Sequence, residues 1–381
     1  MSEIPYIGIR EIFEKAKKLE QKNKKIIHME IGRPDFDTPM SIKKAAINAL
    51  NAGLVHYTSN YGTDELRKAI SRKLKEDNKV DIKPQEVLIT VGAIEGLALS
   101  IFGLLDINDE VLIPSPCFPA YPNQVRLAGC IPVPVPLKME SNFKLNLTDL
   151  EESITPKTKM IIINSPHNPT GTVLENEDLQ MIASFAIKHD LYVVADECYE
   201  KIIYGKEHIS IASLPNMRER TIIINSTSKS FSMTGWRVGF VAANEQIIDS
   251  LVRVHQDITT CANSFAQAGA AFAYMSKADF TKDMLDKYIE RRAIALQYLA
   301  QIAKMELNVP YGAFYVFPSI KKFNISSEEF CDYILNEAGV AIVPGNAFGK
   351  YGDGFVRISY SCSKQDVIEG MKRIVNACRH L

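Results

Sequence analysis

Seven short apolar runs alternate with helix-like segments through the middle of this 381-residue chain. Each run is almost continuously apolar, which is typical of strands that are covered on both faces. Strands that alternate with helices predict an α/β fold with a largely parallel sheet. The expected strands span residues 87–90, 111–114, 131–135, 160–164, 192–196, 221–225 and 238–242.

The pattern changes beyond about residue 279, where a long helix-like segment precedes short strand-like and helix-like stretches. A chain of this length allows one large and one small domain. We expect a large α/β domain at residues 46–280 and a smaller α+β domain formed by residues 1–45 plus 281–381. No internal repeat, low-complexity tract or long linker interrupts this arrangement.

Composition excludes several classes of function. A net charge of −1 gives no support for binding to nucleic acid or to an acidic membrane surface. We expect neither a membrane span nor a cleaved leader, because no apolar run reaches about 18 residues and the N-terminus lacks a basic segment before an apolar one. The seven cysteines are scattered without zinc-ligand spacing, which predicts free thiols, a cytoplasmic location and no metal site.

Lys229 lies just beyond the apolar run at residues 221–225. Desolvation at the edge of a core lowers the pKa of a lysine, and a neutral amine is a nucleophile toward carbonyl groups. Ser226, Ser228 and Arg237 surround it in sequence and could hold a phosphate. A lysine that forms an imine beside a phosphate suggests pyridoxal phosphate (PLP). The alternative is a surface lysine in a serine-rich loop.

Further residues of interest follow other expected strands, and ligands bind at the carboxyl ends of the strands in such sheets. The turn at residues 91–96 opens a helix whose backbone N–H groups could bind an anion, and Phe118 could stack on a flat ring. A plain turn and a packed core aromatic are the alternatives. His167 precedes an N-P-x-G turn, and we expect it to be structural.

Two charged residues stand in apolar surroundings. Asp196 ends an apolar strand, so its carboxylate should be paired. Arg357 lies within the apolar stretch 355–358 and needs an anion, which could be a ligand or an internal salt-bridge partner. The glycine motifs of dinucleotide and nucleoside triphosphate sites are absent from the expected positions, so these ligands are weakly supported.

The run S-x-S-K-x-F-x-M-x-G-W-R at residues 226–237 resembles the lysine motif of the class I/II aminotransferases, which are fold-type I PLP enzymes. N-P-T-G at residues 168–171 and D-E-x-Y at residues 196–199 also match that family. The resemblance covers residues 32–357 and points to the bacterial and archaeal aspartate and aromatic branch. It implies a fold-type I transferase with a mostly parallel seven-stranded sheet flanked by helices, a smaller α+β domain, and PLP as the cofactor.

The resemblance also implies roles for individual residues. Lys229 would carry PLP and move the substrate proton, Asp196 would face the pyridine nitrogen, and Tyr199 would donate a hydrogen bond to the cofactor O3′. The substrate carboxylate would be bound by Gly32, Asn168 and Arg357. The other implied cofactor contacts are Ala93, Ile94, Phe118, Asn168, Ser226, Ser228, Arg237 and Tyr57. Tyr57 would reach the phosphate of a neighbouring subunit, which implies a homodimer with shared active sites.

We therefore expect a ping-pong aminotransferase that moves an amino group from an L-amino acid to a 2-oxo acid such as 2-oxoglutarate. Aspartate-preferring relatives can carry a serine and a lysine where this chain aligns Ile7 and Ile94. Two apolar side chains there favour a neutral, apolar or aromatic donor, since each buried methylene contributes about 0.8 kcal/mol. The alternatives are an aspartate aminotransferase and a C–S β-lyase. A PLP-sensing regulator is disfavoured, because no basic DNA-binding domain precedes residue 32.

Overall fold

The computed structural model describes residues 8–381, and its largest sheet contains the seven strands that the sequence predicts. Their order is β2-β8-β7-β6-β5-β3-β4, and β8 runs antiparallel to both of its neighbours. The sheet is therefore mostly parallel, with bounds within two residues of the predicted ones. The strands are β2 (Val87–Thr90), β3 (Glu110–Ser115), β4 (Ile131–Pro136), β5 (Thr158–Asn164), β6 (Tyr192–Asp196), β7 (Thr221–Ser226) and β8 (Gly239–Ala242).

Helices cover both faces of this sheet, because its strands are apolar on both sides. Alternate residues of a strand point to opposite faces. Thus Ile222 and Ile224 of β7 pack with α4 and α9, whereas Ile223 packs with α3 and α10. The helices of this part of the chain are α3 (Asp64–Asp77), α4 (Ala93–Leu104), α5 (Ala120–Leu127), α6 (Leu147–Ser153), α7 (Asn176–Lys188), α8 (Thr227–Ser230), α9 (Glu245–Ile258) and α10 (Ser264–Met275).

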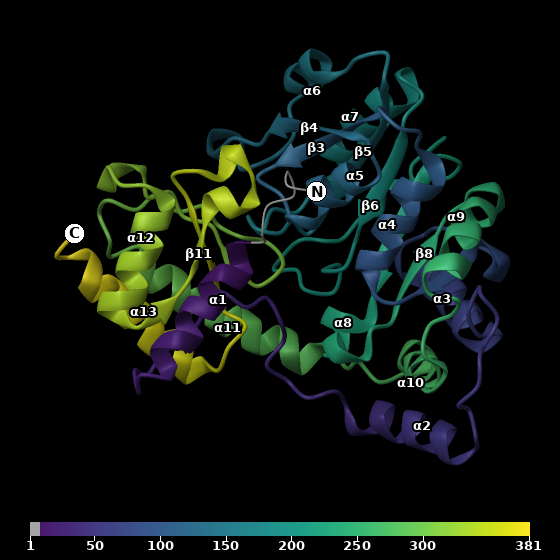
Figure 1. The fold of residues 1–381 in the computed structure, drawn as a ribbon, viewed down its shortest axis with the longest axis horizontal. Helices are drawn as coiled ribbons and strands as arrows, with labels where there is room; N and C mark the ends of the chain where they lie inside the picture. The colour runs from purple at the N-terminus through teal and green to yellow at the C-terminus, as the bar shows by residue number, and fades with distance from the viewer. Residues whose placement is uncertain (1–7) are drawn as a thin grey trace.

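A second core joins the two ends of the chain. Figure 1 shows α1 (Gly8–Glu20) beside the C-terminal helices, and Ile12 packs in one cluster with Ile374. The remaining elements are β1 (Ile27–His28), β9 (Tyr315–Val316), β10 (Val340–Ala341), β11 (Val343–Pro344), β12 (Val356–Ser359), α11 (Lys282–Leu299), α12 (Ser327–Tyr333) and α13 (Lys364–Cys378). β1 pairs with β10, and β12 lies between β11 and β9. The division of the chain into domains at residues 45/46 and 280/281 stays a prediction.

The helix α2 (Met40–Asn51) lies at the lower edge of the molecule in Figure 1. Its inner side buries Ile42 in the cluster that also contains residues of α3 and α10. Its outer side leaves Met40, Ile47 and Leu50 between 41% and 58% exposed. A helix with large apolar side chains on its outer face is typical of a surface that contacts another protein.

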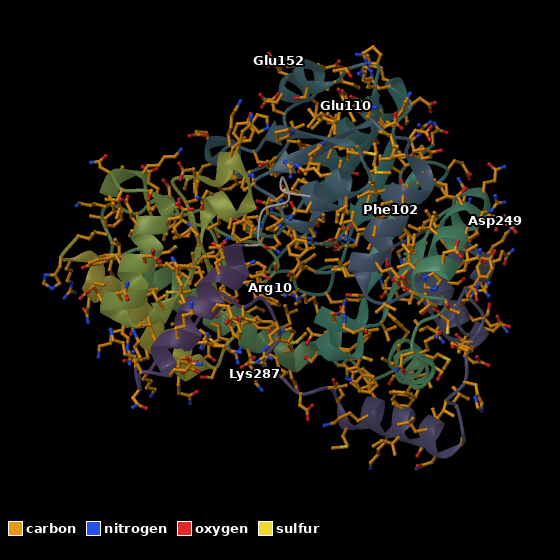
Figure 2. The ribbon with its side chains drawn as sticks, in the orientation of Figure 1. Arg10, Phe102, Glu110, Glu152, Asp249 and Lys287 are labelled. Carbon is orange, nitrogen blue, oxygen red and sulfur yellow. The ribbon has the colours of Figure 1, made fainter. Side chains whose placement is uncertain are left out.

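Charged side chains lie on the outer sides of the helices. In Figure 2 the labelled side chains of Glu152, Asp249 and Lys287 lie on the outside of α6, α9 and α11, and all three residues are exposed. All seven cysteines are free thiols, as the sequence predicts. Among the helices of residues 8–381, none combines the length and the apolar character that a membrane crossing needs.

Candidate active site

A cavity of about 430 Å³ lies at the carboxyl ends of the strands of the large sheet. Asn164, Asp196 and Ser226 reach it from the ends of β5, β6 and β7, where a parallel sheet places its ligands. The segments around Gly32 and Arg357, from the two ends of the chain, contribute to the other side. Residues far apart in the sequence thus meet in one cavity.

Lys229 lies on α8, one turn of helix directly after β7, and its side chain reaches into this cavity. Its Nζ donates a hydrogen bond to the carbonyl oxygen of Gly32 at 2.6 Å. Burial lowers the pKa of Lys229 to about 8, and the nearby positive charge of Arg357 acts in the same direction. The amine is therefore neutral far more often near neutral pH than that of an ordinary exposed lysine, and the neutral form is the nucleophile.

Asp196 ends β6 and is held by two donors. The hydroxyl of Tyr121 donates to Oδ2 at 2.7 Å, and the backbone N–H of Cys198 donates to Oδ1 at 3.1 Å. Burial raises the pKa of Asp196, while these two hydrogen bonds act against the increase. The sequence analysis missed Tyr121, although it lies three residues after Phe118 in the same strand-end motif. Phe118 lines the cavity, with its ring edge-on to that of Tyr121 at 5.7 Å.

Arg357 is 1% exposed on β12 and has no carboxylate partner among residues 8–381. Its Nη1 donates to Oδ1 of Asn168 at 3.1 Å, its Nη2 donates to the carbonyl oxygen of Glu30 at 2.5 Å, and its Nε has no partner. The internal salt bridge that the sequence left open is therefore not found in the described structure. A buried guanidinium bound only by neutral acceptors favours an anionic ligand.

The hydroxyls of Tyr199 and Tyr315 form a hydrogen bond at 2.8 Å, and both residues line the cavity. The Tyr315 ring also lies 4.4 Å from the guanidinium carbon of Arg357. No motif in the sequence marks Tyr315, which lies in one of the short strand-like stretches beyond residue 279. A Cβ atom at Gly32 would lie 2.0 Å from the Tyr315 hydroxyl, so only glycine fits there.

The turn before α4 forms a compact cradle with Arg237. Gly92 has φ of +76°, and a Cβ atom there would lie 2.3 Å from Nη2 of Arg237. That guanidinium donates to the carbonyl oxygen of Val91 at 3.3 Å and to that of Thr234 at 3.0 Å. The expected members of this cradle that line the cavity are Ala93, Ile94, Ser226, Ser228 and Arg237. Free N–H groups at the start of α4 and a guanidinium beside them make an anion site.

Two of the residues singled out in the sequence, Tyr57 and His167, lie away from the cavity. Tyr57 is 87% exposed and does not line the cavity within the described chain, which leaves its role toward a neighbouring subunit a prediction. Ile7 lies outside the described residues. His167 is buried, with Nδ1 2.8 Å from Oγ1 of Thr170, and burial lowers its pKa to about 3. It does not line the cavity, in keeping with the structural role expected for it.

Comparisons with known proteins agree with this geometry. A protein-family model described as aminotransferase class I and II matches residues 24–374. An aspartate aminotransferase of Pyrococcus abyssi is 44% identical over 375 residues, which cover 97% of this chain and 95% of that protein. An aromatic-amino-acid aminotransferase of Thermococcus litoralis is 44% identical over 370 residues, or 96% of this chain and 94% of that protein.

Solved structures give the same result for the fold. The crystal structure of Pyrococcus protein-A1 superposes with a TM-score of 0.96 at 42% identity and covers 99% of this chain and 97% of its own. The aspartate aminotransferase of Thermus thermophilus with maleate superposes with a TM-score of 0.94 at 33% identity, covering 98% and 97% of the two chains. Both similarities extend over the whole arrangement of large sheet, second core and cavity.

Proposed function

We propose, on the premise that this chain belongs to the aminotransferase class I and II family, that it transfers amino groups with PLP bound at Lys229. The transfer of amino groups between amino acids and 2-oxo acids follows from the family itself. The observation that carries the residue assignment is one cavity that brings together the amine of Lys229, the carboxylate of Asp196 and the buried guanidinium of Arg357.

The residues of the cavity fit PLP in three respects. The cradle of Gly92, α4 and Arg237 suits a phosphate. Asp196 suits a protonated ring nitrogen, because its two donors favour the charged form of the carboxylate. Lys229 suits the aldehyde, because burial makes its amine nucleophilic. When bound, PLP would supply an electron sink for the negative charge that develops on the substrate carbon.

The side chains divide the work of the reaction. Arg357 binds the α-carboxylate of the amino acid, and Asn168, already bonded to Arg357, orients it. The amine of Lys229, once free, removes the proton from the substrate α-carbon and returns a proton later. Its pKa of about 8 allows both roles near neutral pH. Tyr199 and Tyr315 supply hydroxyl groups between Arg357 and Lys229.

For the amino donor, we propose a neutral or aromatic amino acid. Ile94 lines the cavity and is 42% exposed, so an apolar substrate side chain can cover it. A second candidate, aspartate, is supported by Arg33. This residue also lines the cavity, is exposed, and has no ion-pair partner among residues 8–381, so it could bind a distal carboxylate.

The two candidates differ in their dependence on Arg33. If the donor is neutral, kcat/KM for phenylalanine or leucine exceeds that for aspartate and Arg33→Gln leaves it unchanged. If aspartate leads by about tenfold or more and Arg33→Gln removes that preference, the proposal from Ile94 is wrong.

The donor reaction should proceed without any 2-oxo acid until the cofactor is converted. Continuous pyruvate release from a cysteine conjugate would instead indicate a β-lyase.

Lys229→Ala tests the assignment of the cofactor. Reduction with borohydride should fix PLP covalently to the natural chain and not to the variant, because the imine forms only at this buried amine. Lys188→Ala, which removes an exposed lysine from an ion pair with Glu151, is the matched control. A variant at Lys229 that still fixes PLP covalently would place the cofactor on another lysine.

We also propose a homodimer. The apolar outer side of α2 and the neighbouring side chains of Leu54, Val55 and Tyr57 are between 41% and 87% exposed. Covering such a surface with a second copy would remove a large apolar area from water. A symmetric contact through α2 would also bring Tyr57 toward the partner.

A further inference from the structure

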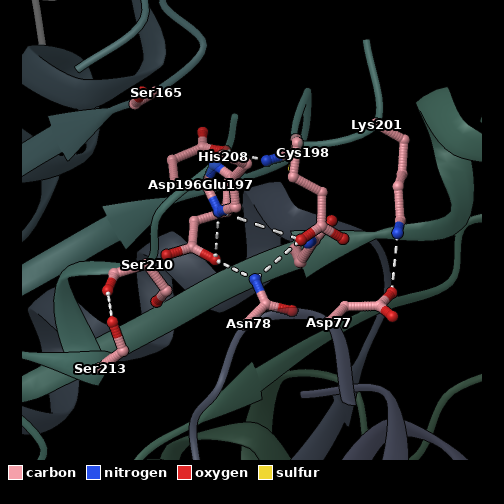
Figure 3. Close-up of polar contacts among 12 residues, drawn as sticks. Asp77, Asn78, Ser165, Asp196, Glu197, Cys198, Lys201, His208, Ser210 and Ser213 are labelled. Carbon is pink, nitrogen blue, oxygen red and sulfur yellow. Dashed lines mark hydrogen bonds and ion pairs between the residues drawn. The ribbon is translucent and has the colours of Figure 1, made fainter. Parts of the chain in front are cut away.

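A second group of charged side chains lies behind the active site and takes no part in the proposed reaction. It consists of Lys73, Glu197, Glu200 and His208, which we call the buried quartet. Their side chains are between 4% and 10% exposed. In Figure 3, Asn78 and His208 converge on the carboxylates that follow Asp196, and the Asp77–Lys201 ion pair lies at the edge of the group.

Contacts within the quartet are direct. Lys73 binds Glu200, and its Nζ also donates to Oδ1 of Asn78 at 2.7 Å. The Nδ2 of Asn78 donates to Glu200 at 2.9 Å and to Glu197 at 3.2 Å. Nε2 of His208 lies 3.1 Å from Oε2 of Glu197 and 4.0 Å from Oε2 of Glu200, close enough for ion pairs although neither angle is that of a hydrogen bond.

The net charge of the quartet indicates what must neutralise it. Two carboxylates and one ammonium leave one negative charge in a buried place, which is costly unless it is neutralised. A proton on His208 makes the quartet neutral. A divalent metal ion bound by Glu197, Glu200 and His208 is possible by distance, since these ligand atoms lie within 4.8 Å of one another. With Lys73 in place, however, such an ion would leave one positive charge, so the proton is favoured.

The quartet lies on the other side of the turn that carries two active-site residues. Asp196 and Tyr199 of this turn line the cavity, whereas Glu197 and Glu200 enter the quartet. Lys73 lies on α3, outside the turn. We propose that His208 is an imidazolium that makes the quartet neutral, and that the quartet thereby holds the turn so that Asp196 and Tyr199 face Lys229.

The charges around His208 support this protonation. Burial acts to lower the pKa of His208, and Lys73 does so as well, but the carboxylates of Glu197 and Glu200 outweigh both and raise it above its ordinary value of 6.5. Although burial acts to raise it, the charges of Lys73 and His208 lower the pKa of Glu200 to about 2. Because the pKa of His208 is raised on folding, its stabilising effect is complete below 6.5 and is lost as pH rises through the raised value.

The first test needs no cofactor. In apoprotein labelled at the histidine ring carbons, the resonance that disappears in His208→Gln should titrate with a midpoint above 6.5. The natural apoprotein should melt at least about 2 °C above His208→Gln at about pH 6, and this difference should shrink toward about pH 9. His56→Gln, which removes an exposed histidine, is the control. A midpoint below 6.5 overturns the proposal.

The second test concerns position and rests on the proposed function. In the PLP-loaded enzyme, His208→Gln should lower kcat by about tenfold while KM changes little, and His208→Lys should restore kcat because it restores the charge. A normal kcat in His208→Gln, with the histidine titration as expected, overturns the positioning role but not the charge assignment. Failure of Lys229 to bind PLP would be a failure of the proposed function instead.

A third test separates the proton from a metal ion. Dialysis of the natural apoprotein against a chelator, or addition of zinc, should leave its melting temperature unchanged. Stabilisation by zinc that is present in the natural chain and absent in His208→Gln would show that the quartet is a metal site and would overturn the proposal.

Discussion

Single residues in this protein act through partners that the cavity brings together. Burial lowers the pKa of Lys229, and the donors Tyr121 and the backbone N–H of Cys198 oppose the rise in the pKa of Asp196 that burial causes. The guanidinium of Arg357 can bind an anion because the groups that it donates to are neutral. Each of these chemical properties belongs to an environment rather than to the side chain alone.

Tyr121→Phe tests the hydrogen bond to Asp196. Loss of a 2.7 Å bond to a carboxylate costs about 1.5–3 kcal/mol, so we expect kcat to fall by about tenfold or more. The pKa of Asp196 should rise further, because a bond that favours its charged form is gone. Activity should therefore be lost at a higher pH on the acid side of the pH profile. Tyr274→Phe, in a tyrosine outside this cavity, is the control, and an unchanged acid limb in Tyr121→Phe would contradict the argument.

At the scale of elements, the strand ends and helix starts position the chemistry. β5, β6 and β7 each end at the cavity, and α4 begins beside it with a glycine at its N-cap. The short α8 turns Lys229 back toward Gly32 of the N-terminal segment. Residues of β5, β6, β7 and α4 pack in one cluster of the core beside these junctions.

Gly92→Ala tests the junction before α4. A Cβ atom there would be 2.3 Å from Arg237 at a φ of +76°, so Arg237 must move and the anion cradle should be distorted. We expect affinity for PLP or for inorganic phosphate to fall by about tenfold or more. Gly205→Ala is a matched control, since its φ is +69° but nothing lies within 4 Å of the added atom. Phosphate affinity in Gly92→Ala as high as in Gly205→Ala would contradict the argument.

At the scale of the whole molecule, the cavity is formed between the large sheet and segments from both ends of the chain. Gly32 comes from one end and Arg357 from the other, and they meet at Lys229 and Asn168. In the proposed dimer, the exposed apolar side of α2 and Tyr57 would extend this arrangement toward a second copy. An active site completed by another subunit would make activity depend on assembly.

Subunit mixing tests the shared site. Tyr57→Ala and Lys229→Ala should each be impaired alone. In a mixed dimer, one site combines an intact Lys229 with an intact Tyr57 from the partner, so mixing should recover activity above the mean of the two variants. Sedimentation should show a dimer for each variant and for the mixture. A mixture that only averages the two activities, or a fully active monomer, would contradict the shared site.

The sequence by itself determined the seven strands, because each is a compact apolar run bounded by turn residues. It also determined the family, because its motifs are local in the chain: the lysine motif at residues 226–237 and N-P-T-G at residues 168–171. Local patterns of this kind depend on backbone preference and burial, which neighbouring residues largely specify.

Only the tertiary structure showed the partners. Tyr121 is 75 positions from Asp196, Tyr315 is 116 positions from Tyr199, and Lys73 is 127 positions from Glu200. No local pattern marks these pairs, because they depend on which strand ends and helices become neighbours in the sheet. The same reason explains why the order of the strands, with β8 antiparallel between β2 and β7, follows from long-range packing rather than from any one segment.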